Sequence, residues 1–86
     1  MSTLPENQVI NIAKTVAASN GVSFTDVRTA PAVDSTGAPA MEIRFVLTPG
    51  SSAAIMGQRS ANTIVQIMQK LADAGEDRFP IVQYEE

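Results

Sequence analysis

Few side chains in this sequence could act as catalysts. Its 86 residues include no cysteine and no histidine, which excludes disulfides, thiol catalysis, imidazole bases and zinc sites built from these ligands. The serine and threonine hydroxyls therefore have no histidine to activate them. The carboxylates of Asp26, Asp34 and Glu42 stand alone in the sequence and form no acid–base pair. We therefore expect a protein that is not an enzyme and that carries no cofactor.

One acidic cluster precedes the C-terminal tail, at Asp73, Glu76 and Asp77. Carboxylate oxygens on a turn can hold a hard cation. The spacing here lacks the glycine-containing alternation of a calcium loop, so a solvated turn is the better interpretation. We predict no metal site.

A glycine-containing segment, Gly57-Gln58-Arg59-Ser60, lies between the short apolar run Ala53-Ala54-Ile55-Met56 and a longer helical pattern. It resembles the Gly-x-x-Gly loop of KH domains, in which two helices and the loop between them hold four nucleotides. The resemblance implies that Gly57 and Arg59 contact a nucleic-acid backbone. Ser60 replaces the second glycine, so the loop is degenerate. The alternative is an ordinary turn with Ser60 as the helix N-cap.

The C-terminal segment, Gly75-Glu76-Asp77-Arg78-Phe79-Pro80-Ile81-Val82-Gln83-Tyr84, is similar to the last strand of small bacterial proteins without a settled activity. That resemblance implies at most an accessory or partner protein. The residues also have a purely structural interpretation. Gly75 would end a helix, and Arg78 would pair with a neighbouring acid. Glu76 and Asp77 would face water, and Phe79 would enter the core.

The overall charge argues against nucleic acid as a partner. The net charge is −3 and the isoelectric point is about 4.7, whereas nucleic-acid-binding domains usually carry a basic surplus. The first residues contain no basic segment followed by an apolar run, so we expect no signal peptide. The apolar runs are far shorter than the ~20 residues that cross a bilayer. These features predict a cytoplasmic protein with no membrane partner.

Hydrophobic periodicity predicts one domain over residues 1–86. A helix is expected over 4–19, with Thr3 and Glu6 as a capping box and Asn20-Gly21 as its end. Strands are expected over 22–28 and 40–47, joined by a long hairpin loop over 30–39. A short helical turn is expected at 53–56 and a long helix from Arg59 to the glycine at 75. A last strand follows over 79–84, at a sheet edge because of Pro80.

The expected fold is an α+β two-layer sandwich of order αββ(α)αβ, with the two main helices on one face of a three-stranded sheet. Alternation in 40–47 turns four apolar side chains toward the helices and leaves Val46 on the outer side. Alternation in the last strand sends outward either Phe79 and Ile81 or Val82 and Tyr84. The candidate interface residues are Val46, Val82 and Tyr84.

Three classes of function remain, and a protein–protein interaction or homo-oligomeric accessory module fits best. The expected partner is a second copy in a twofold dimer, or an unidentified protein. The alternative is a degenerate KH-like RNA-binding module, and a small-ligand or enzymatic role comes last. The first two differ in charge geometry. RNA would require the arginines to gather on one face, and these are Arg28, Arg44, Arg59 and Arg78.

Overall fold

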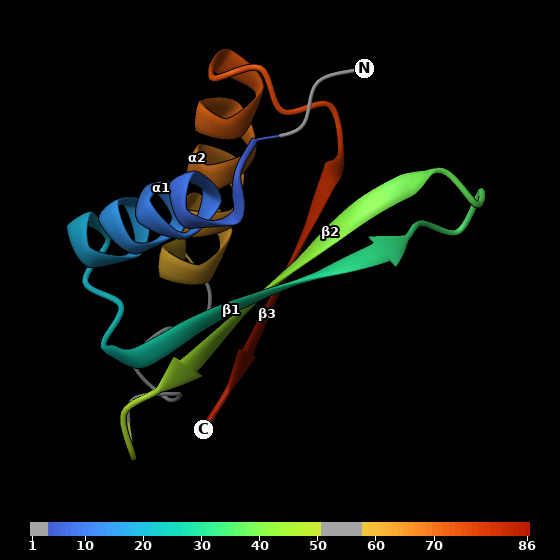
Figure 1. Ribbon diagram of the computed structural model, residues 1–86. Helices are drawn as coiled ribbons and strands as arrows, with labels where there is room; N and C mark the ends of the chain where they lie inside the picture. Colours follow the sequence, from blue (N-terminus) through green and yellow to red (C-terminus); the bar gives the residue numbers. More distant parts are fainter. Residues whose placement is uncertain (1–3, 51–57) are drawn as a thin grey trace.

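The computed structural model describes residues 4–50 and 58–86, which form a three-stranded sheet covered on one face by two helices (Figure 1). The elements are α1 (Glu6–Ser19), β1 (Phe24–Val33), β2 (Pro39–Leu47), α2 (Gln58–Asp73) and β3 (Phe79–Glu85). This arrangement confirms the α+β class and the order of the main elements. The helical turn expected at 53–56 lies outside the described residues.

Helix α1 begins at Glu6, two residues later than expected. Pro5 is its N-cap residue, and the Pro5 carbonyl accepts the Gln8 and Val9 N–H groups at 3.0 and 3.2 Å. Proline is tolerated here because its missing N–H would have no helical acceptor. Thr3, half of the expected capping box, lies outside the described residues. The helix ends as expected before Gly21, whose φ of 78° is in the left-handed region.

The hairpin of β1 and β2 is longer than the sequence predicts, and the loop expected over 30–39 is wrong. Strand β1 continues to Val33, and its residues pair antiparallel with β2 as far as Pro39. Only 34–38 form the turn. There the Asp34 carboxylate accepts the Thr36 hydroxyl and the N–H groups of Thr36 and Ala38. These bonds, the Thr36 hydroxyl first, lower the pKa of Asp34.

The sheet order is β1-β2-β3, with β3 parallel to β2. Helix α2 makes the crossover between these two parallel strands, which a tight turn cannot do. The predicted apolar face of β2, with Met41, Ile43, Phe45 and Leu47, is buried against the helices. Ile67 and Leu71 of α2 are buried in the same core. The prediction that both helices cover one face is therefore confirmed.

Candidate functional site

The uncovered face of the sheet is the first candidate surface, and the register defines it in four rows across the strands. From one end to the other, the rows are Asp26, Val46 and Glu85; Arg28, Arg44 and Gln83; Ala30, Glu42 and Ile81; and Ala32, Ala40 and Phe79. We call this set the outer face. The first two rows and Glu42 form the charged half, in which only Val46 is apolar, and the other residues of the last two rows form the apolar half.

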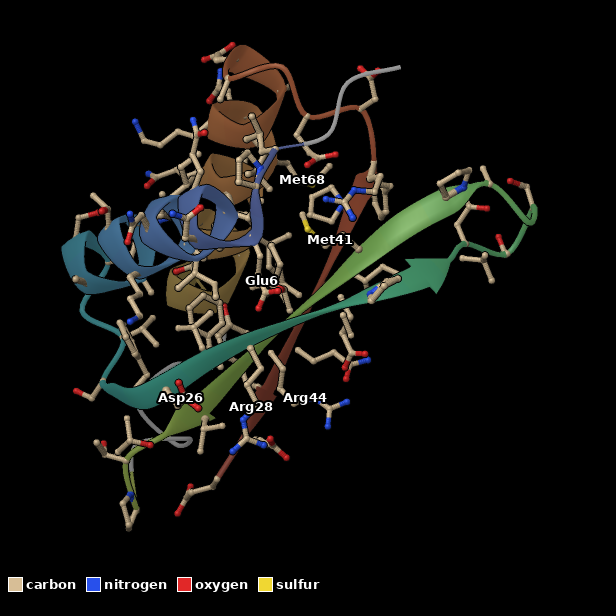
Figure 2. All side chains as sticks on the ribbon, viewed as in Figure 1. Glu6, Asp26, Arg28, Met41, Arg44 and Met68 are labelled. Atoms are coloured by element: carbon tan, nitrogen blue, oxygen red, sulfur yellow. The ribbon has the colours of Figure 1, made fainter. Side chains whose placement is uncertain are left out.

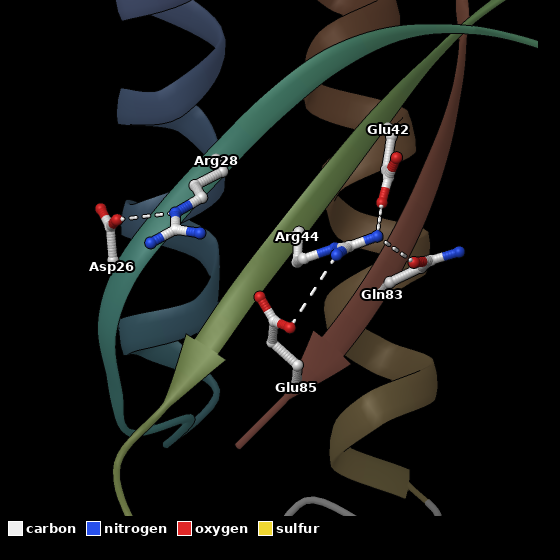
Figure 3. Close-up of polar contacts among 6 residues, drawn as sticks. All are labelled: Asp26, Arg28, Glu42, Arg44, Gln83 and Glu85. Carbon is white, nitrogen blue, oxygen red and sulfur yellow. Dashed lines mark hydrogen bonds and ion pairs between the residues drawn. The ribbon is translucent and has the colours of Figure 1, made fainter.

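Ion pairs join the charged half of the outer face (Figure 3). Arg44 lies at the centre, bonded to Glu42 and to the Gln83 amide oxygen at 3.1 Å, with Glu85 at 3.8 Å. Arg28 lies directly across from Arg44 and pairs with Asp26 at 3.2 Å. Two like charges side by side on a sheet repel each other. The carboxylates on either side offset this repulsion, so the cluster carries no basic surplus.

The described arginines do not gather on one surface. Arg28 and Arg44 line a shallow depression of about 280 Å³ on the outer face, together with Glu42. Arg78 lies apart from them, at the start of β3, where it is bonded to Glu76. Arg59 lies in the first turn of α2, and its side chain is outside the described part of the structure. Gly57 also lies outside the described residues, so the two KH-like loop residues remain a prediction.

The apolar half of the outer face resolves the alternatives left by the sequence. On β3, Phe79 and Ile81 face outward, because they pair with Ala40 and Glu42 of the outer face. Phe79 is 50% exposed, so the expectation that it enters the core is wrong. Phe79 shares its row with Ala32 and Ala40.

Two of the three candidate interface residues face the other way. Val82 and Tyr84 pair with Ile43 and Phe45 and pack against the core. The Tyr84 ring stacks on Phe45 with 5.5 Å between centroids. Val46 is on the outer face as expected, half-buried between Asp26 and Glu85. Val82 and Tyr84 therefore contribute packing under the helices and do not belong to the outer face.

A buried ion pair replaces the solvated turn that the sequence predicts at Glu76. The Glu76 side chain is fully shielded from water. Its carboxylate accepts the Leu4 N–H at 2.9 Å, the Arg78 N–H at 3.1 Å, and Arg78 Nε and Nη2 at 2.9 and 3.0 Å. These donors, first of all the Arg78 guanidinium, lower the pKa of Glu76 to about 2, and Glu76 raises that of Arg78.

The acidic cluster does not form a cation site in the described part of the chain. Glu76 turns inward to Arg78, whereas Asp73 and Asp77 remain exposed. Within residues 4–50 and 58–86, no three Asp, Glu, His or Cys side chains are placed to hold a metal ion together. Through its hydrogen bond from the Leu4 N–H, Glu76 instead joins the chain before α1 to the turn between α2 and β3.

Helix α2 carries a second candidate surface. Thr63, Ile67 and Leu71 are buried and face the sheet. On the side of the helix next to α1, Gln66 accepts a hydrogen bond from Asn20 at 3.0 Å. Because each residue turns the helix by about 100°, Ile64 and Met68 lie nearly opposite Gln66. Ala61, Ala72 and Val65 lie between these two residues and the side of the helix that faces away from the sheet. We call these five residues the α2 flank.

The α2 flank is apolar and largely uncovered. Val65 is 59% exposed, Ala61 and Ala72 are exposed, and Ile64 and Met68 are half-buried. Met68 and Ala72 border a depression of about 240 Å³ that continues to Phe79 and Pro80. The flank therefore adjoins the start of β3. A clue was present in the sequence, since the apolar face of this helix is too broad to be buried against one sheet.

Comparison with protein-family models, curated proteins and solved structures finds no match. Across the described residues, no helix has the length and apolar character needed to cross a membrane. Figure 2 shows the described side chains, with Arg28 and Arg44 on the side of the sheet away from the helices and Met41 and Met68 on the helix side.

Proposed function

We propose that this chain is a non-catalytic protein-interaction module that works as a homodimer. The observation that carries the proposal is the set of large apolar side chains that the core leaves uncovered. Val33, Val65 and Phe79 are 68%, 59% and 50% exposed. Scattered exposed apolar residues are ordinary, but Val65 and Phe79 belong to surfaces that adjoin the same depression at the start of β3.

The small size of the chain supports the same proposal. A domain of 86 residues buries a smaller fraction of its surface than a larger domain does, and its stability is correspondingly limited. Covering an apolar surface with a second copy adds burial that one chain lacks. The proposal includes the cytoplasmic location expected from the sequence.

Self-association is the direct test. At micromolar concentration, sedimentation equilibrium should give a mass near twice the 9.1 kDa of one chain, because the uncovered apolar groups favour association. The apparent mass should fall toward one chain on dilution. A mass of one chain that persists up to about millimolar concentration would refute the homodimer.

The charge distribution leads us to expect no tight binding of single-stranded RNA or DNA. The net charge is −3, and Arg28, Arg44 and Arg78 each lie beside a carboxylate. Phosphate binding would have to compete with those carboxylates. Fluorescence anisotropy with labelled oligonucleotides at physiological salt should show no submicromolar binding. Submicromolar affinity that Arg59→Ala weakens would favour the KH-like alternative instead.

A further inference from the structure

We propose that two copies associate side by side through β3 and the α2 flank, around a twofold axis beside β3. This inference rests on the proposed homodimer and specifies its surface. The two sheets would join edge to edge into one sheet of six strands, and the two α2 helices would pack against each other above the junction. The occupant of the α2 flank is therefore a second copy of this chain.

The two edges of the sheet are not equally suited to pairing with another strand. The free edge of β1 is obstructed. The N–H of Val27 is occupied by the Asp26 carboxylate at 2.9 Å. Pro31 has no N–H to donate to β2. A proline fits in β1 only at a position whose backbone nitrogen points away from β2, toward the free edge. Residues two and four apart in a strand point to the same edge, so Val27 shares the free edge with Pro31. A register irregularity at Thr25 further disturbs this strand.

Strand β3 forms the other edge and is less obstructed. Within the described residues it pairs with β2 only. Its proline, Pro80, is the second of its seven residues, which leaves a regular strand over 81–85. Natural proteins often cover or interrupt an exposed edge strand to prevent pairing. In the described part of the chain, β3 carries such an interruption only at its start.

The α2 flank lies on the same side of the molecule as this edge. Helix α1 packs on β1 and helix α2 packs on β3, and Figure 3 shows them behind these strands. Gln66 marks the side of α2 that faces α1, so the flank opposite Gln66 points beyond β3. The strand edge and the exposed helix side are thus presented together, and one partner can cover both.

The order of side chains in the flank is suited to a second copy. Ala61, Val65, Met68 and Ala72 are separated by four, three and four residues, a spacing that is unchanged when the helix is reversed. An antiparallel α2 from a twofold partner therefore sets alanine against alanine at both ends and valine against methionine in the middle. Small residues at the ends allow the helices to approach closely.

Electrostatics does not oppose this contact. The five flank residues are uncharged, and the charged side chains in the described part of α2, Lys70 and Asp73, lie on the side toward α1. Two copies of the flank can therefore meet without like-charge repulsion. The contact is about 16 Å long on the helix and about 13 Å long on the regular part of the strand, residues 81–85.

A pair of matched valine substitutions tests the surface. Val65→Glu places one carboxylate from each copy in the proposed contact. It should raise the dimer dissociation constant by about 100-fold in sedimentation equilibrium, because a central interface position is lost. Val33→Glu is the control, since Val33 is even more exposed but lies at the end of β1, the strand at the obstructed edge. Its dissociation constant should stay within about threefold of the parent.

Cross-linking provides a second measurement that does not require a destabilising charge. The chain has no cysteine, so Val65→Cys introduces a unique thiol. A short bis-maleimide should convert the Val65→Cys protein, but not the Val33→Cys protein, to covalent dimer at micromolar concentration. Far-UV circular dichroism of each variant checks that it is folded.

The outcomes separate this inference from the proposed function. Loss of dimer with Val65→Glu, together with cross-linking at position 65, supports the β3 and α2 contact. A dimer that withstands Val65→Glu but dissociates with Val33→Glu or Val46→Glu overturns the inference and leaves the homodimer intact. A parent protein that is monomeric at all concentrations overturns both.

Discussion

Replacing Glu76 with glutamine should lower the free energy of unfolding by about 3 kcal/mol at pH 7. The carboxylate is fully shielded from water and accepts four hydrogen bonds, two of them from the Arg78 guanidinium. Glutamine has nearly the same shape but no charge, and it leaves the half-buried Arg78 without its counter-ion. Chemical denaturation of both proteins at a fixed concentration measures the difference.

The pH dependence of this difference is the sharper part of the prediction. Folding lowers the pKa of Glu76 from 4.5 to about 2, so the folded state favours the ionised form. The stabilisation is complete above about pH 4.5 and is lost as the pH falls toward 2. The parent and the Glu76→Gln protein should therefore converge in stability across that range.

An exposed carboxylate on α2 provides the control for Glu76. Asp73→Asn removes a charge from the last turn of the helix, where Asp73 is exposed. Surface substitutions of this kind usually change stability by less than about 1 kcal/mol. A Glu76→Gln difference that is equally small, or that does not shrink with acid, would contradict the buried ion pair.

Leu71→Ala should lower the free energy of unfolding by about 2–5 kcal/mol, the range found when buried leucines are truncated. Leu71 is 1% exposed and belongs to the core between α2 and the sheet. The substitution removes apolar contacts and leaves a cavity that the surrounding elements fill only in part. Urea denaturation at one protein concentration measures the loss, since self-association would also contribute to stability.

Gln69→Ala is the matched control on the same helix. Gln69 is exposed, so its replacement should change stability by less than about 0.5 kcal/mol. A loss below about 1 kcal/mol for Leu71→Ala would mean that the buried face of α2 is assigned to the wrong residues.

The elements with strong periodicity could be predicted from the sequence. Strand β2 has its large apolar residues at alternate positions, Met41, Ile43, Phe45 and Leu47, and α2 carries apolar residues at helical spacing, so each pattern favours one type of element. The second half of β1 has no such pattern. The segment Ala30-Pro31-Ala32 has low strand propensity. It is extended because it pairs with β2 in the sheet. Local sequence does not contain that tertiary contact.

The candidate surfaces were harder to predict for two physical reasons. Alternation places Phe79 and Ile81 on one side of β3 and Val82 and Tyr84 on the other, but it does not say which side faces the helices. The pairing with β2 decides this. The pairing of Arg78 with a neighbouring acid could be predicted and is confirmed at Glu76. The burial of Glu76 could not, because its second donor segment, at Leu4, is 72 residues away in the sequence.

The bond between Leu4 and Glu76 also bears on the kinetics of folding. Closing a loop across 72 residues costs more entropy than closing a hairpin, and contacts of such long separation tend to form late. The hydrogen bond between Leu4 and Glu76 can form only after α1, α2 and the start of β3 have packed together. Its free energy should therefore be largely absent from the transition state, so that losing it speeds unfolding and leaves the folding rate nearly unchanged. In this small domain, the hydrogen bond between Leu4 and Glu76 therefore slows unfolding.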